Sequence, residues 1–127
     1  PLVDAPAVRS WSWPVSGKVI TPFDGGRHKG IAIGGSKGDR VVAAADGRVI
    51  FAGTMRNYGN IIVVKHAGDL LSVYAHNDTN GVKEGQNVRR GQAIATLGSS
   101  DAPSDQLHFE IRRQGKPVDP LSLLPSR

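Results

Sequence analysis

Residues 41–53 read VVAAADGRVIFAG, and this stretch indicates the class of fold. Two apolar runs flank Asp46 and Gly47, a pair that favours a tight turn because glycine adopts positive φ at little cost. We therefore expect two strands joined in a hairpin at Asp46 and Gly47. The same pattern of short apolar runs, separated by Gly, Asn or Asp, continues along the chain.

Four further runs predict strands, because they are short and rich in β-branched and aromatic residues. They are residues 60–66 (NIIVVKH), 70–76 (LLSVYAH), 92–98 (QAIATLG) and 107–113 (LHFEIRR). No segment shows a 3.6-residue period over three turns, so we expect an all-β domain of roughly seven to nine strands.

The N-terminal segment differs in composition from the rest. Residues 1–10 hold two prolines and no regular period, which predicts the end of a linker. From Trp11 the chain is expected to enter a sheet, with Trp11 and Trp13 covering the edge of the core. Residues 11–127 are therefore predicted to form one domain.

Composition excludes several kinds of chemistry. The chain of 127 residues has no cysteine, which removes disulfides, thiol nucleophiles and thiolate metal sites. A net charge of +5 favours anionic partners. The basic residues are scattered, and only 2 Trp, 2 Tyr and 3 Phe are present, so nucleic acid is not expected as a partner.

Residues 81–98 (GVKEGQNVRRGQAIATLG), taken with 45–53 (ADGRVIFAG), resemble the hammerhead hairpins of biotinyl and lipoyl carrier domains. Carriers present a modified lysine at the tip of a tight hairpin. Here Arg48 follows the turn and no lysine is offered, so a carrier function is not expected.

Three histidine motifs occur in a recognisable order: His28 begins HKGIAI, His76 ends YAH, and His108 lies in LHFEI. Together with WPVSG near the N-terminus, they resemble the LytM or M23 family of zinc peptidases over about residues 11–125. The stretches GNIIVVKH, YAHNDT and VDPLSLLP are most similar to NlpD-type activators of cell-wall amidases. The resemblance implies an all-β, M23 peptidase-like sheet domain.

The resemblance also implies which positions carried chemistry. Active members read H-x-x-x-D, Y-x-H and H-x-H, with zinc on the first histidine, the aspartate and the last histidine. His28 and His108 match the two metal-binding histidines, and His76 matches the histidine of Y-x-H. Ala32 stands at the aspartate position and Gln106 at the first histidine of H-x-H.

These replacements predict a degenerate site. Two neutral imidazoles without a carboxylate should bind zinc weakly, and an amide cannot accept a proton near neutral pH. We therefore expect no enzyme activity and no cofactor. The vestigial catalytic positions are His76 and Gln106, and the vestigial metal positions are His28, Ala32 and His108.

Other residues near the motifs have simpler interpretations. Asp24 and Asp105 could supply a displaced carboxylate to zinc, but neither occupies a motif position. A peptidase with a rearranged metal site therefore stays an alternative. His66, at the end of residues 60–66, matches no chemical position and is expected to be a polar strand end.

Strand alternation predicts which side chains share a face. His108, Glu110 and Arg112 should point together, with Phe109 and Ile111 towards the core. By the same rule two further sets should share a face: Tyr74 with His76, and His28 with Gly30 and Ala32.

The resemblance implies a role for such a vacated groove. NlpD-type domains bind zinc-dependent N-acetylmuramoyl-L-alanine amidases of the periplasm and relieve their autoinhibition, which promotes septal peptidoglycan splitting during division. We expect the amidase to contact eight residues: Lys29, Ala32, Tyr58, Tyr74, His76, Gln106, His108 and Arg112.

The same resemblance implies an outer-membrane lipoprotein of a Gram-negative bacterium, with any membrane attachment through a lipid anchor outside residues 1–127. Peptidoglycan is a second possible partner. A non-catalytic peptidoglycan-binding module is therefore another alternative.

Overall fold

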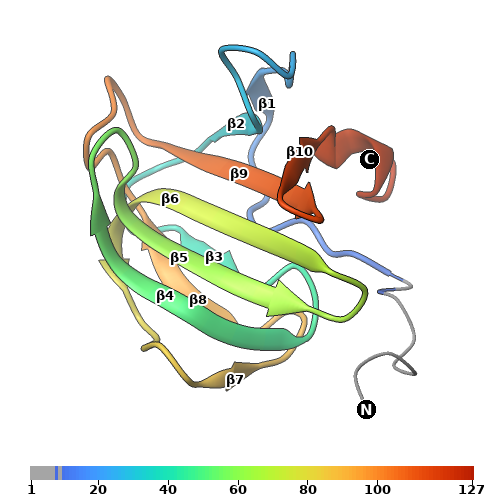
Figure 1. The fold of residues 1–127 in the computed structure, drawn as a ribbon. Helices are drawn as coiled ribbons and strands as arrows, with labels where there is room; N and C mark the ends of the chain where they lie inside the picture. Colours follow the sequence, from blue (N-terminus) through green and yellow to red (C-terminus); the bar gives the residue numbers. More distant parts are fainter. Residues whose placement is uncertain (1–7, 9) are drawn as a thin grey trace.

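The computed structural model describes residue 8 and residues 10–127, and its secondary structure is almost entirely antiparallel β-sheet (Figure 1). Ten strands are formed, followed by one short 3₁₀ helix, η2. The strands are β1 (Val19–Thr21), β2 (Ile31–Gly34), β3 (Arg40–Val42), β4 (Gly47–Met55), β5 (Gly59–His66), β6 (Leu70–Asn80), β7 (Asn87–Val88), β8 (Ala93–Leu97), β9 (Gln106–Arg113) and β10 (Lys116–Val118), and η2 is Pro120–Ser122.

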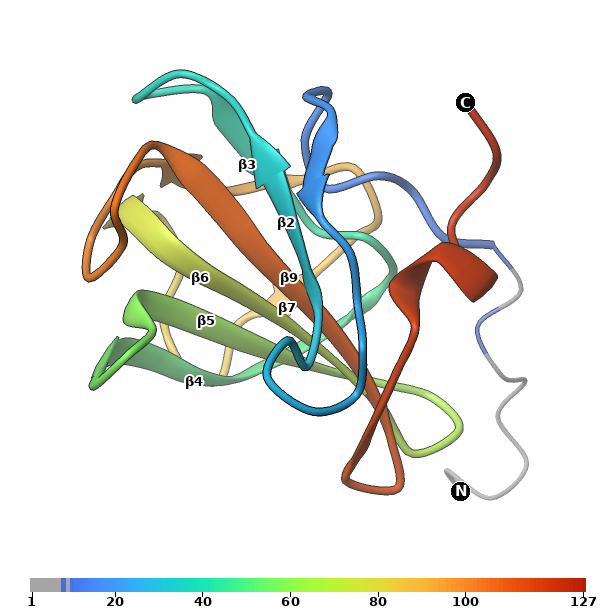
Figure 2. The ribbon, with the colours of Figure 1, turned by 90° about the horizontal axis from the view of Figure 1, so that it is seen from above.

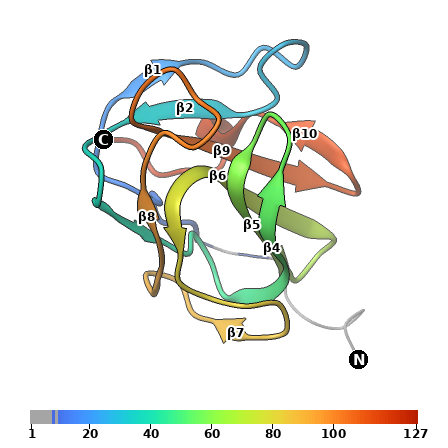
Figure 3. The same ribbon diagram turned by 90° about the vertical axis from the view of Figure 1, so that its left-hand side faces the viewer.

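One long sheet forms the frame, with strand order β1-β2-β9-β6-β5-β4-β7. The central strand β6 pairs with β5 and β9 along most of its length, and its last residues pair with β8, which in turn pairs with β3. Strand β6 thus leaves β5 and β9 and ends beside β8. As a result, β3 and β8 lie across one side of the sheet (Figures 2 and 3). The opposite side of β2, β9, β6, β5 and β4 is called here the outer face.

The main core fills the space between the long sheet and the β3–β8 layer. Its largest fully buried side chains include Tyr74 and Phe109, whose rings lie 5.4 Å apart. Trp11 is also buried, at 6% exposure, which confirms its predicted place at the edge of the core. Phe109 and Ile111 face this core, as strand alternation predicted.

The all-β class is confirmed, and all four predicted runs contain a strand. The strand number is ten rather than seven to nine, because β3, β7 and β10 have only two or three residues each. Within the described residues no helix is long and apolar enough to cross a bilayer. The predicted linker, residues 1–10, lies outside the described residues except for Val8 and Ser10, and Val8 packs against the core.

The predicted hairpin at Asp46 and Gly47 is wrong. The chain does turn there, but β3 pairs with β8, whereas β4 pairs with β5 and β7. Gly47 is not among the residues with positive φ. It is required for space, because a Cβ at this position would lie 2.4 Å from the carbonyl oxygen of Lys65.

The two stretches that resemble hammerhead hairpins do meet in space. Residues 45–53 lie mostly in β4, and residues 81–98 contain β7 and β8. The two stretches pair with each other through β4 and β7.

His66 is confirmed as a polar strand end, and it is buried at 4% exposure. Its Nδ1 lies 2.6 Å from the carbonyl oxygen of Asp46, which can only accept, so Nδ1 carries the proton. Its Nε2 lies 2.7 Å from the Ser72 hydroxyl, which lies 2.8 Å from the hydroxyl of Tyr74. This chain joins the long sheet to the backbone of Ala44, whose N–H donates to the Tyr74 hydroxyl at 2.9 Å.

Substitution of Gly47 by alanine tests the close approach of β4 to β5. We expect Gly47→Ala to lower the free energy of unfolding by about 1–3 kcal/mol, because the added methyl overpacks a buried contact. Urea unfolding measures the change. Gly26→Ala is the matched control, since a Cβ there meets only a carboxylate oxygen of Asp24 at 3.6 Å. Equal stability of the two variants would contradict the interpretation.

Burial lowers the pKa of His66 below its ordinary value of 6.5, although its hydrogen bond to Asp46 opposes this. As the pH falls below 6.5, the unfolded chain takes up this proton before the folded chain does, so stability decreases until the lowered folded pKa is passed. Urea unfolding at about pH 7.5 and about pH 5 should therefore show a smaller loss for His66→Gln than for the wild type. An equal loss would exclude His66 as a source of acid sensitivity.

Candidate functional site

The three histidine motifs meet around β9 on the outer face. Strand β9 lies between β2 and β6, and its register places Ala32 on one side of His108 and Ala75 on the other. His108 is thus flanked by two methyl groups. This register sets the motif positions 32 and 108 side by side.

Glu110 is the centre of the site's polar contacts, and its side chain has no solvent exposure. Its Oε2 accepts hydrogen bonds from His108 Nε2 at 2.7 Å and from the Tyr58 hydroxyl at 3.0 Å. Its Oε1 accepts from Arg112 Nε at 2.7 Å and lies 2.7 Å from Arg112 Nη2. The predicted common face of His108, Glu110 and Arg112 is therefore confirmed.

These contacts keep Glu110 charged despite its burial. Burial alone would raise the pKa of this carboxyl, but the hydrogen bonds and charges of His108 and Arg112 outweigh it and lower the pKa. Burial and the Glu110 charge together raise the pKa of the Tyr58 hydroxyl, which therefore stays protonated and donates. The carboxylate oxygen can only accept, so the ring nitrogen Nε2 of His108 carries a proton.

His76 joins this cluster through an irregularity in β6. Its φ is 66°, in the left-handed region that non-glycine residues rarely adopt, and the pairing with β5 shifts register there. Its ring centroid lies 6.0 Å from that of His108, and the Tyr58 ring lies 5.7 Å from His108 on another side. Burial lowers the pKa of His76, and the nearby His108 lowers it further against the effect of a hydrogen bond to Ser100.

The predicted common face of Tyr74 and His76 is wrong. Tyr74 is fully buried in the main core, so it cannot contact a partner from the outer face. The bulge at His76 adds a residue to β6 and breaks the alternation on which the prediction relied. Tyr74 instead supports the site from beneath, through its packing on Phe109.

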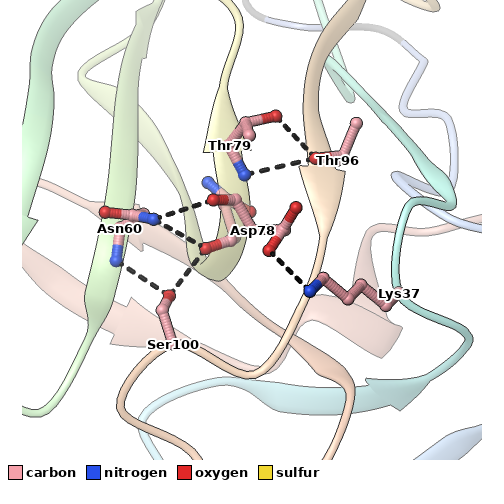
Figure 4. A network of polar contacts seen from close by, with 7 residues as sticks. Lys37, Asn60, Asp78, Thr79, Thr96 and Ser100 are labelled. Atoms are coloured by element: carbon pink, nitrogen blue, oxygen red, sulfur yellow. Dashed lines mark hydrogen bonds and ion pairs between the residues drawn. The ribbon is translucent and has the colours of Figure 1, made fainter.

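A polar network fixes the chain around His76. His76 Nδ1 donates to the Ser100 carbonyl oxygen at 2.8 Å, and its backbone N–H donates to Tyr58 at 2.8 Å. Figure 4 shows the adjoining contacts, in which Asn60 and Ser100 donate to backbone carbonyls of residues 77 and 78. Asp78 also forms an ion pair with Lys37 at 3.7 Å. The unusual backbone of His76 is thus held by contacts from β5 and the β8–β9 loop.

The β1–β2 loop carries the first motif and is exposed. Asp24 Oδ1 accepts from the backbone N–H groups of Gly26 and His28, at 2.7 and 3.1 Å. His28 and Lys29 are exposed and precede β2, so the alternation predicted for His28 with Ala32 does not apply. Gly30 is buried. A Cβ there would lie 2.2 Å from the Phe109 carbonyl oxygen and 2.7 Å from Glu110 Cγ, so only glycine fits at this position.

Gln106 lies at the start of β9, where it pairs with Gly34 and Gly98. Its side-chain amide donates to Ser104, with distances of 3.4 Å to the carbonyl oxygen and 3.3 Å to the hydroxyl. Like His108, it is partly exposed. It can offer hydrogen bonds to a partner but no base.

The donor set does not fit a three-ligand zinc site. Ala32, opposite His108, has no atom that could bind a metal ion. The carboxylate of Asp24 accepts from its own loop, which argues against its use as a displaced ligand. Among residue 8 and residues 10–127, no group of three or more His, Asp or Glu side chains is gathered to hold a metal ion. No chemical step is therefore assigned to a metal.

Comparison with known proteins shows the family of this chain. The model of "Peptidase family M23" matches residues 26–120. The chain belongs to peptidase family M23. Its fold is that of an M23 domain: a zinc-containing peptidase from Vibrio cholerae superposes with a TM-score of 0.86 at 30% identity, covering 93% of this chain and 41% of that chain.

The predicted similarity of this M23 domain to NlpD-type activators is confirmed. It is 55% identical over 123 residues to the murein hydrolase activator NlpD of Salmonella dublin, which covers 94% of this chain and 33% of the relative. It is 49% identical to the lipoprotein NlpD/LppB homolog of Pseudomonas aeruginosa over 130 residues, covering 100% of this chain and 44% of that relative. The chain thus spans less than half the length of these relatives.

A hollow of this M23 domain lies away from the histidine cluster. A cavity of about 990 Å³ opens where β4 begins and β5 ends, and Arg48, Ile50, Lys65 and Glu84 are among its lining residues. It shares no residue with the predicted site. The motif positions Ala32 and His108, together called here the vacated centre, lie instead on the outer face of the sheet.

Sequence reasoning missed Glu110 as the organising residue of the site. A signal was present, since Glu110 is the one acidic residue in LHFEIRR and has a histidine and an arginine two positions away on either side. Alternate residues of a strand share a face, so all three must meet.

Replacement of Glu110 by glutamine tests its role. We expect Glu110→Gln to lower the free energy of unfolding by about 2–3 kcal/mol, somewhat less than for a fully buried ion pair because Arg112 retains access to water. Chemical denaturation measures this loss, and Glu84→Gln is the exposed control. If both variants unfold at the wild-type denaturant concentration, Glu110 does not organise the site.

Proposed function

We propose that this M23 domain is a non-catalytic activator of a periplasmic, zinc-dependent N-acetylmuramoyl-L-alanine amidase. The observation that carries the proposal is Ala32, whose methyl group stands beside His108 at the position where active peptidases hold zinc with a carboxylate. Its similarity to proteins named murein hydrolase activators supports the same role. The activation would promote septal peptidoglycan splitting during cell division.

The amidase is proposed to bind the outer face around the vacated centre. The contact residues are Lys29, Ala32, Tyr58, His76, Gln106, His108 and Arg112. Tyr74 leaves the predicted set because it is buried. Tyrosine and arginine are enriched among the residues that dominate interface energies, and Tyr58 and Arg112 are both held in place by Glu110 before any partner arrives.

Fixed side chains favour such a function physically. An activator must bind the open amidase more tightly than the autoinhibited one, since only the difference in affinity shifts the population. A shift from 1% to 99% open needs about 5.5 kcal/mol of discrimination. Side chains that are already ordered lose little entropy on binding, which leaves more of the contact energy for this discrimination.

The proposed compartment is the periplasm of a Gram-negative bacterium, as part of an outer-membrane lipoprotein. Support comes from relatives that are named lipoproteins. Any lipid anchor would lie outside residues 1–127, and the predicted linker at residues 1–10 would connect it to the domain at residues 11–127.

Reconstitution with a purified, autoinhibited amidase of the source bacterium tests the function. The wild-type domain should accelerate dye release from labelled peptidoglycan, and Lys29→Glu should raise the concentration needed for half-maximal activation by about tenfold, a loss of ~1.4 kcal/mol. Lys29 is exposed, so the charge reversal should leave the fold intact. The control is Lys83→Glu, at an exposed lysine of the loop before β7, which should activate like the wild type.

The domain alone separates this function from its two alternatives. Without amidase it should release no dye, and elemental analysis should find less than stoichiometric zinc. Chelator-sensitive dye release with one zinc per chain would instead establish a peptidase. Binding to purified sacculi without any effect on the amidase rate would establish a peptidoglycan-binding module.

A further inference from the structure

The outer face carries three parallel rows of side chains, defined by strand register. The first row contains the vacated centre, with Ala32, His108 and Ala75. The second row runs Phe51, Val63, Val73 and Glu110 across β4, β5, β6 and β9. The third row runs Arg48, Lys65, Leu71 and Arg112 across the same four strands.

Three members of the second row, Phe51, Val63 and Val73, form a continuous apolar surface with Leu71 of the third row. Val73 is buried at 5% exposure, together with Ile61 and Ala75, whereas Phe51, Val63 and Leu71 are partly exposed above them. These three side chains come from adjacent strands, so they form one patch rather than scattered contacts. A contiguous apolar patch beside a polar rim is typical of an interaction site.

The third row places positive charge along one side of this patch. Arg48, Lys65 and Arg112 are aligned in register with Leu71. The one acidic side chain in these rows, Glu110, has no solvent exposure and is already bonded to Arg112 and His108. Among the described residues, Arg48 and Lys65 take part in no ion pair. Within the three rows, the side chains that a partner meets are therefore apolar and basic, while Asp69 and Glu84 line the hollow beside Arg48 and Lys65.

We propose that Phe51, Val63, Leu71, Lys65 and Arg48, named here the apolar–basic strip, form a second contact region for the amidase. The occupant is an amidase segment that presents apolar side chains next to carboxylates. This inference rests on the proposed function and extends it beyond the vacated centre. Arg112, a proposed contact at the vacated centre, lies beside Leu71 in the third row and so joins the two regions.

The dimensions allow one partner segment to cover both regions. Side chains two positions apart on a strand are about 7 Å apart, so the first and third rows are separated by about 14 Å. An extended segment of four or five residues spans that distance. The strip is thus close enough to add affinity to contacts at His108 without a separate binding event.

Charge distinguishes this occupant from a second copy of the chain. A two-fold symmetric dimer places the same patch of each copy against the other. Here that arrangement would bring Arg48 and Lys65 of one copy against the same cations of its mate, which is unfavourable. A partner with carboxylates at these positions gains what a second copy would lose.

Two substitutions test the strip by separate physical terms. Val63→Glu places a charge in the apolar patch, and Lys65→Glu reverses one cation of the third row. We expect each to weaken binding of the purified, autoinhibited amidase by about tenfold, measured by titration calorimetry. Thermal unfolding of each variant checks the fold, and exposed Lys65→Glu keeps the test decisive if Val63→Glu is unstable.

Matched controls lie outside the strip. Ile20→Glu replaces an apolar side chain that is 54% exposed on the edge strand β1, and Lys18→Glu reverses an exposed lysine just before β1. Both controls should bind like the wild type. The effect of Lys65→Glu should shrink at high salt, because exposed charge pairs are screened.

The outcomes separate this inference from the proposed function. If Lys29→Glu loses activation while folded Val63→Glu and Lys65→Glu bind like the wild type, the strip is not a contact region and the activator function stands. If the wild-type domain neither binds nor activates the amidase, the function itself fails. Sedimentation that shows a dimer abolished by Lys65→Glu would assign the strip to a second copy and overturn the proposal.

Discussion

Glu110 places a full negative charge on β9 where no water reaches it, and the neighbourhood is built to neutralise that charge. Three groups on the outer face donate to it: the Tyr58 hydroxyl, the His108 imidazole and the Arg112 guanidinium. A buried charge without these partners would cost several kcal/mol. The positions of the three side chains are therefore set by the free energy of folding, before any ligand is bound.

The same frame underlies the proposed non-catalytic function. The sheet still brings the motif positions together, with Ala32 opposite His108 and His76 beside it. Ala32 offers a methyl group where active family members hold zinc with a carboxylate, and the surface around it carries aromatic, imidazole and cationic groups. Under the proposed function, these groups contact another protein.

Strand periodicity predicted part of the site well and failed at one residue. His108, Glu110 and Arg112 share a face because β9 alternates without interruption. Tyr74 and His76 do not share a face, because His76 adopts a left-handed backbone conformation that its residue type does not predict. Its cause is tertiary: the Tyr58 and Ser100 carbonyl oxygens bind its backbone N–H and its ring. Bulges of this kind depend on neighbours far along the chain, which a local pattern cannot contain.

The sequence by itself determined the all-β class, the positions of the main strands, the family, and the presence of alanine at position 32 and glutamine at position 106. Each of these follows from residue type and spacing alone. Only the tertiary structure decided that β3 pairs with β8 and not with β4, that Tyr74 is buried beneath the site, that Glu110 organises it, and that Phe51, Val63 and Leu71 line up with Lys65 and Arg112. Strand pairing is settled by which apolar faces can be buried together and by the space at close contacts such as Gly47, and both depend on segments distant in the chain.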